Sequence, residues 1–224
     1  MDHPRAVPLQ PTLWRTCRVL ANRHRLRILQ AVIRHPGQTV SQVAQTLNLR
    51  LPMASSYLRA LNARGLLQAV RSGRYVYYSP SPDPSVTGTT PLLEALKRTL
   101  ASERHGIPRA FRQLTAFTHP RRLVILKVLS VSAQGSTLQQ LRTATGISRA
   151  ALVRHLAKLG RRGLVDQSFG RYRCVHPKTC LARTLMTLGV GRGRTPPAPT
   201  VSPARSAGRR ADPQAFSKAV LQPR

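Results

Sequence analysis

The sequence predicts a mainly α-helical protein made of two tandem copies of one small domain, each with a short β-hairpin. The first observation is a repeat, because the stretch from Leu26 to Leu67 recurs from Leu123 to Val165. The second is that apolar residues in both copies recur at three- and four-residue steps, as in helices. The third is that each copy ends in β-rich segments around a glycine, as in a hairpin. Such a repeat indicates two like domains.

Apolar positions and turn glycines carry the repeat, so the shared property of the copies is their fold. At an offset of 97, Leu26, Ile28 and Leu29 recur as Leu123, Ile125 and Leu126. At an offset of 98, the recurring set is Val43, Leu49, Leu58, Leu61, Gly65 and Leu66, which become Leu141, Ile147, Leu156, Leu159, Gly163 and Leu164. One extra residue near the Ala133–Gly135 turn explains the change. Gly73-Arg74-Tyr75 then recurs as Gly170-Arg171-Tyr172.

Caps, breakers and apolar spacing predict the elements of the first copy. Asn22 and Ser41 are the expected N-caps of the second and third helices, and Gly65 is the expected end of the fourth. In order, we expect helices at Thr12–Leu20, from Asn22 to about Ile33, from Ser41 to Leu47 and from Pro52 to Arg64, a short strand at Thr39-Val40, and hairpin strands at Leu66–Val70 and Tyr75–Ser79.

The second copy repeats this order after a linker rich in Pro, Ser and Thr and a further helix at Pro91–Glu103. Ser148 is the expected cap of its longest helix. In order, we expect helices at Pro108–Phe117, Pro120–Ser130, Leu138–Thr145, Ser148–Arg162 and Thr179–Leu188, a short strand at Ser136-Thr137, and hairpin strands at Leu164–Ser168 and Arg171–Val175.

These segments set the expected domain boundaries. We expect a flexible lead-in at 1–10, a first domain at 11–80, a linker at 81–90, a connecting, dimerisation-type helix at 91–104, a second domain with its terminal helix at 105–190, and a disordered basic tail at 191–224. The tail is rich in Pro, Ala, Gly and Arg without periodicity, which is typical of disorder. It either adds non-specific DNA affinity or only solubilises the chain.

Charge indicates a polyanionic partner. Thirty-seven Lys and Arg face six Asp and Glu, for a formal net charge of +31. No acidic residue lies between Asp2 and Asp83, or between Glu103 and Asp166, and each gap spans the body of one copy. GC-rich coding explains a preference for Arg over Lys, but not the missing acids. Such a field favours nucleic acid or an anionic membrane.

Other function classes lack their signatures. Three cysteines do not make a disulfide framework, and no apolar run is long enough to span a membrane. The Arg-rich start imitates a transit peptide, but its LRILQAV segment recurs mid-chain, so we expect a cytoplasmic or nucleoid-associated protein. The six carboxylates form no acid/base pair, and no phosphate-binding glycine loop is present. The sequence therefore predicts no catalytic site and no cofactor.

The predicted order of elements is that of a winged helix-turn-helix domain, and the amino-acid sequence of these elements is more specific than their order. LANRHRLRILQAV, then TVSQVAQTLNL, RALNARGLL and SGRYVYY, closely resembles ArsR-type bacterial regulators. The second copy matches through THPRRLVILKVL and RHLAKLGRRGLV. The resemblance covers residues from about 12 to 188. It implies two DNA-binding domains, dimerisation through first and last helices, and a reading helix in the major groove.

Carried onto this chain, the resemblance gives two reading helices and two wings. Periodicity places Ala54, Leu58 and Leu61 in the first core, with Leu152, Leu156 and Leu159 in the second, so the alternate faces are free. The expected reading residues are Pro52, Met53, Ser55, Ser56, Tyr57 and Arg59 in the first copy, and Ser148, Arg149, Ala150, Arg154, His155 and Lys158 in the second. The expected wing contacts, to phosphate or the minor groove, are Arg71, Ser72, Gly73 and Arg74, and Gly170, Arg171 and Arg173.

The two reading helices differ. The second carries Arg149 and Arg154, and Arg contacts guanine bidentately, whereas the first is rich in Ser with one Arg. Many ArsR-like repressors sense metals through a Cys pair in the third helix, and neither TVSQVAQT nor STLQQLRT contains Cys. Cys174, His176 and Cys180 lie close in sequence, but zinc commonly needs four ligands, so we expect no metal site.

The sequence therefore predicts a sequence-specific regulator of transcription that binds double-stranded DNA, with its two copies paired as an intrachain pseudo-dimer. A homodimer of whole chains remains open. One alternative is a non-specific nucleoid or architectural DNA-binding protein, which the charge favours. Another is a winged-helix module that docks RNA or protein.

Overall fold

The structure is a computed structural model that describes residues 12–191. The lead-in predicted at 1–10 and, apart from Gly191, the tail predicted at 191–224 lie outside the described residues. Within the described range, helices dominate and the strands form two small antiparallel sheets. The predicted fold class, mainly α with small hairpin wings in two winged helix-turn-helix copies, is confirmed.

The first copy runs from α1 to α5. Its elements are α1 (Leu13–Leu20), α2 (Arg23–Arg34), β1 (Gln38–Thr39), α3 (Val40–Leu47), α4 (Leu51–Asn62), β2 (Gln68–Ser72), β3 (Tyr75–Ser79) and α5 (Thr89–Leu100). The strand order in its sheet is β1-β3-β2, so β3 is central. The hairpin β2–β3 is the wing of this copy.

The second copy repeats that order from α6 to α10. Its elements are α6 (Gly106–Leu114), α7 (Pro120–Val131), β4 (Ser136–Thr137), α8 (Leu138–Thr145), α9 (Arg149–Arg161), β5 (Val165–Ser168), β6 (Arg171–Cys174) and α10 (Cys180–Val190). Its sheet has the order β4-β6-β5, which is the same topology.

The start of α3 differs from the prediction. Thr39, not Ser41, is the N-cap, and its hydroxyl accepts from the Gln42 N–H while the Gln42 side chain accepts from the Thr39 N–H. This capping box satisfies two backbone donors at once, which a cap at Ser41 would not. Val40 is therefore helical, and the short strand is Gln38–Thr39. Thr137 and Gln140 form the same box at the start of α8, so the repeat extends to capping.

The wings differ in length, which the sequence repeat hides. Thr39 of β1 pairs with Tyr77, and Thr137 of β4 pairs with Arg171. Registered this way, Tyr172 corresponds to Tyr78 and not to Tyr75. The first wing continues two residue pairs further, through Arg71↔Val76 and Ser72↔Tyr75, before its turn. The matching Gly-Arg-Tyr letters thus occupy different places in the two hairpins.

Both copies share one hydrophobic core. The buried apolar residues of α1 to α10 form a single contiguous cluster. Helix α5 buries seven of its twelve residues, more than any other described helix, while Thr90, Glu94 and Arg98 form part of an exposed face. Its most extensive helix partner is α10, the corresponding helix of the second copy, and it also contacts α6. Domains this small gain stability from such packing.

Glycines mark where the copies meet closely. A Cβ at Gly88, the N-cap of α5, would lie 2.8 Å from Leu188 Cδ2 on α10. A Cβ at Gly189 of α10 would lie 3.0 Å from Leu13 Cδ2 on α1. Each contact joins one copy to the other, so the two copies approach closely at these glycines.

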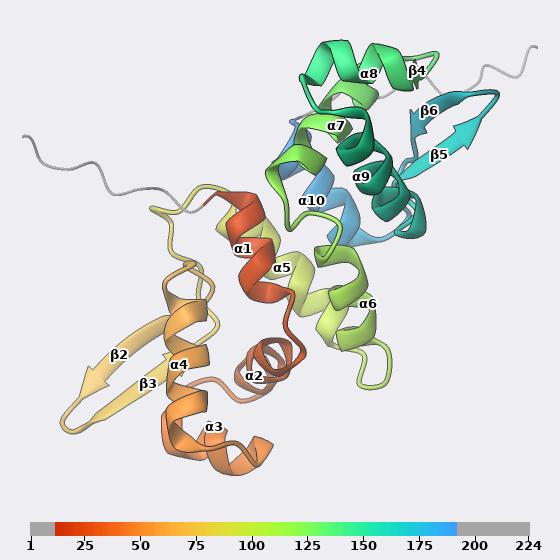
Figure 1. The fold of residues 1–224 in the computed structure, drawn as a ribbon. Helices are drawn as coiled ribbons and strands as arrows, with labels where there is room; N and C mark the ends of the chain where they lie inside the picture. The colour runs from red at the N-terminus through yellow and green to blue at the C-terminus, as the bar shows by residue number, and fades with distance from the viewer. Residues whose placement is uncertain (1–11, 192–224) are drawn as a thin grey trace, which may run out of the picture.

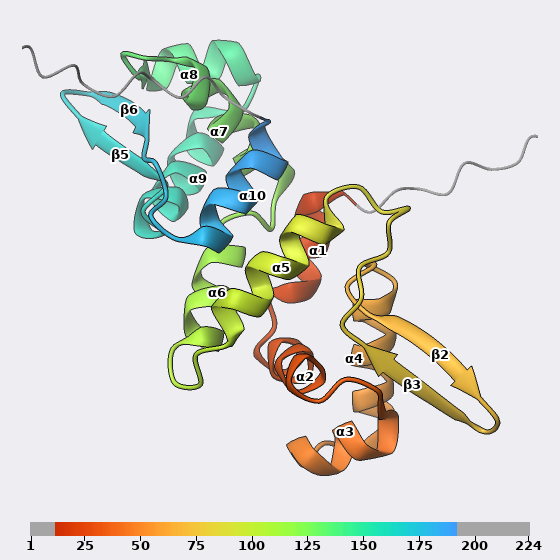
Figure 2. The same cartoon turned by 180° about the vertical axis from the view of Figure 1, so that it is seen from behind.

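The two copies are arranged around α5 and α10. Helices α4 and α9 both lie on the face turned toward the viewer in Figure 1, and the wings point away from each other at opposite ends. From behind, α5 and α10 are in front and α4 and α9 recede (Figure 2). A half-turn about the line of view in Figure 1 takes one copy roughly onto the other. The fold therefore presents both reading helices on one side.

Candidate nucleic-acid interface

Packing fixes which face of each reading helix is free. The predicted core positions are buried: Ala54, Leu58, Leu61, Leu152, Leu156 and Leu159. Of the predicted reading residues, the structure exposes Pro52, Met53, Ser56, Arg59, Ser148, Arg149, Ala150 and Arg154, and half-buries Ser55, Tyr57, His155 and Lys158. The periodicity argument about the core is confirmed, and the DNA contacts of the exposed residues stay a prediction.

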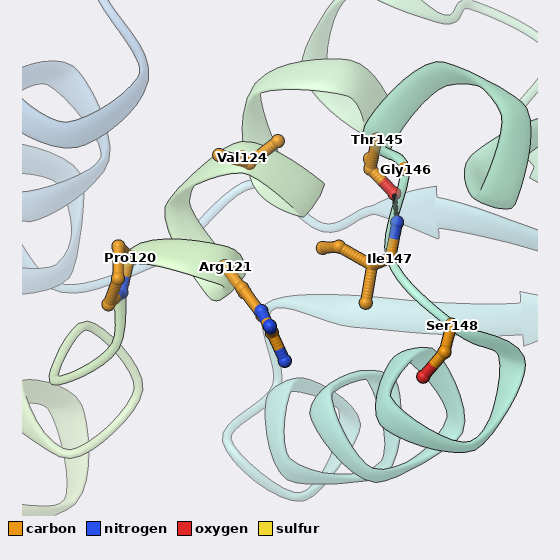
Figure 3. Close-up of a pocket in the computed structure, with 7 residues that line it drawn as sticks. All are labelled: Pro120, Arg121, Val124, Thr145, Gly146, Ile147 and Ser148. Carbon is orange, nitrogen blue, oxygen red and sulfur yellow. Dashed lines mark hydrogen bonds between the residues drawn. The ribbon is translucent and has the colours of Figure 1, made fainter.

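The N-terminus of α9 borders an open cavity of about 490 Å³. Figure 3 shows Arg121 extending from the first turn of α7 toward the start of α9, where Ser148 lies, with Val124 and Ile147 also lining the space. Ser148 is at the N-cap position of α9, but its hydroxyl makes no cap hydrogen bond in this described segment. A guanidinium, a free hydroxyl and a helix N-terminus together favour an anion. Sequence reasoning missed Arg121.

Two histidines connect α7 to the reading helix α9. The rings of His119 and His155 lie 4.6 Å apart between centroids. His119 caps α7, because its Nδ1 accepts from the Arg121 N–H at 3.1 Å. Burial and the neighbouring charges of Arg122, Arg121 and Arg18 lower the pKa of His119. Burial, then the neighbouring charges of His119, Arg122, Arg121 and Arg154, lower the pKa of His155. This arrangement therefore favours neutral imidazoles.

Arg122 of α7 lies near both histidines and is held in place by two hydrogen bonds. It is 7% exposed, and it donates from Nη1 to the Thr115 carbonyl at 2.7 Å and from Nη2 to the Thr118 hydroxyl at 2.7 Å. Burial and the nearby Arg162 lower the pKa of Arg122. Burial, then Arg162, Arg122 and Arg161, lower the pKa of Lys158 on α9. Arg122, Lys158, Arg161 and Arg162 thus form a strongly positive region beside α9.

The first copy has an aromatic contact at the corresponding place, with an arginine beside it. The rings of His24 and Tyr57 stack at 6.4 Å, and the Arg25 guanidinium lies 5.4 Å from the Tyr57 ring centroid. Tyr57 occupies the place of His155, which explains why it is half-buried. The start of α4 also exposes Leu51 (52%) and Met53 (40%). This reading helix is therefore less charged and more apolar than α9.

The wings place their arginines differently. Arg71 and Arg74 are exposed, and the Arg74 guanidinium lies 5.0 Å from the Tyr75 ring centroid. Arg171 donates from Nη1 to the Gly135 carbonyl at 3.2 Å, and Arg173 donates from Nε to the Gln134 carbonyl at 3.4 Å. The arginines of the second wing thus tie it to the turn before β4. Its tip is Phe169, which sequence reasoning also missed although it directly precedes the turn glycine.

Few acids oppose this positive surface. Within residues 12–191, the ion pairs are Arg34–Glu103 at 3.1 Å and Lys97–Glu94 at 2.8 Å, on α2, α5 and the turn after α5. Neither involves a residue of α4, α9 or a wing. The cations of the reading helices are therefore left for a polyanion.

Comparisons with known proteins agree with this geometry. Residues 119–167 match the model of the bacterial regulatory protein, arsR family, and residues 22–68 match a model for winged helix-turn-helix DNA-binding. The chain is 35% identical over 77 residues to the HTH-type transcriptional regulator YgaV of Escherichia coli strain K12, covering 34% of this chain and 77% of that protein. The chain belongs to the ArsR-type winged helix-turn-helix regulators. No solved structure matches it.

The chain contains two copies of the winged helix-turn-helix domain. The two models match one copy each, and each spans the helix-turn-helix and the start of the wing. DNA-binding regulation of transcription is therefore the function class of this chain. Among residues 12–191, no helix is long and apolar enough to cross a membrane.

The described side chains that could bind a metal do not gather at one place. Among the described residues, no three His, Cys, Asp or Glu side chains come together in a way that could hold a metal. Cys17 is fully buried, and burial raises the pKa of its thiol. Burial also raises the pKa of Cys174. Raised thiol pKa values disfavour the thiolate that binds metals.

Proposed function

We propose that this chain is a sequence-specific regulator that binds double-stranded DNA through α4 and α9 in successive major-groove segments. The observation that carries the proposal is the placement of both reading helices on one face of a molecule whose copies share one core. In a helix-turn-helix dimer, two such helices contact half-sites about one turn of DNA apart. Here one chain supplies both.

The two helices would read different sequences. Exposed Arg149 and Arg154 on α9 suit bidentate contacts to guanine. On α4, Ser55, Ser56 and Met53 suit hydroxyl contacts and apolar contact with a thymine methyl. Further contributions would come from Pro52, Tyr57 and Arg59 on α4, and from Ser148, Ala150, His155 and Lys158 on α9. The preferred site is then an asymmetric pair of half-sites.

Phosphate contacts would set the register on the duplex. Arg121 and the N-terminus of α9 border the cavity of Figure 3, which suits one phosphate. The exposed Arg71 and Arg74, with Ser72 and Gly73, suit the backbone beside the first half-site, and Gly170, Arg171 and Arg173 that beside the second. We propose that this regulator does not sense metals through a Cys pair in the third helix, as many ArsR-like repressors do, because neither α3 nor α8 contains Cys.

Selection of bound sequences from a random duplex pool by the full chain tests this proposal. We expect two different half-sites with centres about 10 base pairs apart, bound by one chain. A perfect palindrome occupied by two chains would contradict the pseudo-dimer. The same measurement reports specificity, spacing and symmetry.

The charge of +31 supports a second candidate, a non-specific architectural DNA-binding protein. Each neutralised phosphate steepens the log–log salt dependence of binding by about 0.9. Titration of the selected and a random duplex at several salt concentrations separates the two candidates. An affinity ratio near one at every salt concentration favours architecture.

A docking role for RNA or protein is tested by substitution on α9. Replacing Arg149 and Arg154 together by Ala is expected to weaken binding of the selected duplex by about 10- to 100-fold per side chain. Arg98 is an exposed arginine of α5, and α5 lies on the opposite side of the molecule from α4 and α9 (Figure 2), so Arg98→Ala is the matched control and is expected to bind normally. Unchanged binding by the α9 variant would favour the docking role.

A further inference from the structure

The tip of the second wing carries a fully exposed aromatic side chain. Phe169 is 100% exposed, more than any other large apolar residue described. It lies between β5 and β6 in a two-residue turn with Gly170, since Ser168 pairs with Arg171. Removing this side chain from water requires a partner, because nothing in residues 12–191 covers it.

The turn holds Phe169 in an unusual backbone conformation. Its φ is +49°, followed by +70° at Gly170. Two-residue hairpins of this form need positive φ at both central positions and strongly prefer Asn-Gly, Asp-Gly or Gly-Gly. Phenylalanine is an outlier at such a position, and outliers of this kind concentrate at functional sites. Turn chemistry therefore does not explain this residue.

The hairpin below Phe169 is fixed. Strand β6 lies between β4 and β5, and its Arg171 and Arg173 donate to the carbonyls of Gly135 and Gln134. A Cβ at Gly135 would lie 2.6 Å from the Tyr172 carbonyl oxygen, so the turn and β6 are in close contact. A rigid hairpin can push its tip residue into a partner without losing the position of that residue.

We propose that Phe169 is a wedge that enters the minor groove beside the second half-site and partly unstacks one base step. Apolar side chains used in this way kink DNA by about 20–90°. A DNA partner fits the surroundings, because residues 161–173 contain four arginines and one acid, Asp166. The wing also lies next to α9, the more basic reading helix (Figure 1).

The wedge would act on one side only. The turn of the first wing is Gly73-Arg74, whose arginine suits a narrow groove and not an intercalating contact. The bend is therefore expected at the second half-site alone. Flexible pyrimidine–purine steps such as TA or CA kink most easily, so one of them is expected where Phe169 enters.

This inference rests on the proposed DNA-binding function, and DNA distortion tests it separately from binding. The full chain is mixed with its selected duplex, which carries a donor and an acceptor at its ends for energy transfer and 2-aminopurine at successive steps beside the second half-site. Wild type is expected to shorten the end-to-end distance and to brighten 2-aminopurine at one step. Phe169→Asn is expected to lose both signals while it still binds.

Asn suits the turn, so Phe169→Asn is expected to fold with unchanged or higher thermal stability. Phe169→Leu retains an apolar tip and is expected to retain most of the bend. Val131→Ala, which trims another exposed apolar residue (78%), is the control and is expected to behave as wild type. An equal bend and equal 2-aminopurine signal in Phe169→Asn would overturn the wedge, whereas failure of the wild-type chain to select any preferred duplex from the random pool would overturn the proposed function instead.

Discussion

At the scale of single residues, the histidine pair is expected to make the second domain sensitive to pH. The pKa values of His119 and His155 are both lowered, so protonation is harder in the folded chain than in the unfolded one. The contribution of the two neutral histidines to the free energy of unfolding is complete above the ordinary histidine pKa of about 6.5, and it is lost as the pH falls below that value. The domain is therefore expected to lose stability on acidification through this region.

His119→Asn tests this pH dependence. Asn22 caps the corresponding helix α2, where its side chain accepts from the Arg25 N–H at 3.0 Å, so Asn is expected to cap α7 as well. The free energy of unfolding, measured by urea at pH 7.5 and pH 5, is expected to fall less in the variant than in wild type. His24→Asn, outside this pair, is the control. An equal fall in His119→Asn and wild type would show that the pair does not couple protons to folding.

Two glycines are expected to respond oppositely to alanine. A Cβ at Gly106 would lie 2.8 Å from the backbone oxygen of Thr99 and 3.1 Å from Leu100 Cα, and backbone cannot move aside cheaply. Gly106→Ala is expected to cost about 1–3 kcal/mol. At Gly160, inside α9, the nearest atom would be 3.6 Å away, so Ala is expected to stabilise by up to about 1 kcal/mol. Chemical denaturation measures both, and destabilisation by both substitutions would contradict this account of the α5–α6 junction.

At the scale of elements, the sequence predicts the order and type of helices and strands because periodicity, caps and turn glycines are local signals. The free faces of α4 and α9 follow from the same periodicity, since Leu58 and Leu156 are buried as expected. The wing register does not follow. The letters Gly-Arg-Tyr align the two turns, whereas pairing with β1 and β4 aligns Tyr78 with Tyr172.

The parts of the site that sequence reasoning missed depend on tertiary packing. His119 meets His155 across 36 residues only because α7 and α9 pack together. Arg121 reaches the N-terminus of α9 for the same reason. Phe169 had a local signal, its place before a turn glycine, but its full exposure became clear only with the hairpin register.

The difference between α4 and α9 makes a prediction about the operator. At an offset of 98, Leu51, Ser56 and Ala60 correspond to Arg149, Arg154 and Lys158. The triple variant Leu51→Arg, Ser56→Arg, Ala60→Lys gives α4 the cations of α9. Selection with this variant is expected to move the first half-site toward the sequence of the second, giving a more palindromic site.

The double variant Thr90→Arg, Thr187→Arg is the control. It adds charge at exposed positions on α5 and α10 and is expected to leave the selected sequence unchanged. An unchanged first half-site in the triple variant would show that these positions do not read bases.

At the scale of the whole molecule, the shared core joins the stability of the two copies. Leu96 is fully buried in α5, which packs against α10 of the second copy. Leu96→Ala is expected to cost about 2–5 kcal/mol. Because α5 and α10 belong to one cluster, the loss is expected to reach both copies and not the first alone. Hydrogen exchange should therefore quicken in α4 and in α9 together, with a single unfolding transition at a lower denaturant concentration.

Leu61→Ala, within the first copy, is the comparison, and Val131→Ala is the control that is expected to behave as wild type. If α9 keeps its protection in Leu96→Ala while α4 loses it, the copies are independent domains on one chain, and the fixed spacing between their half-sites loses its structural basis.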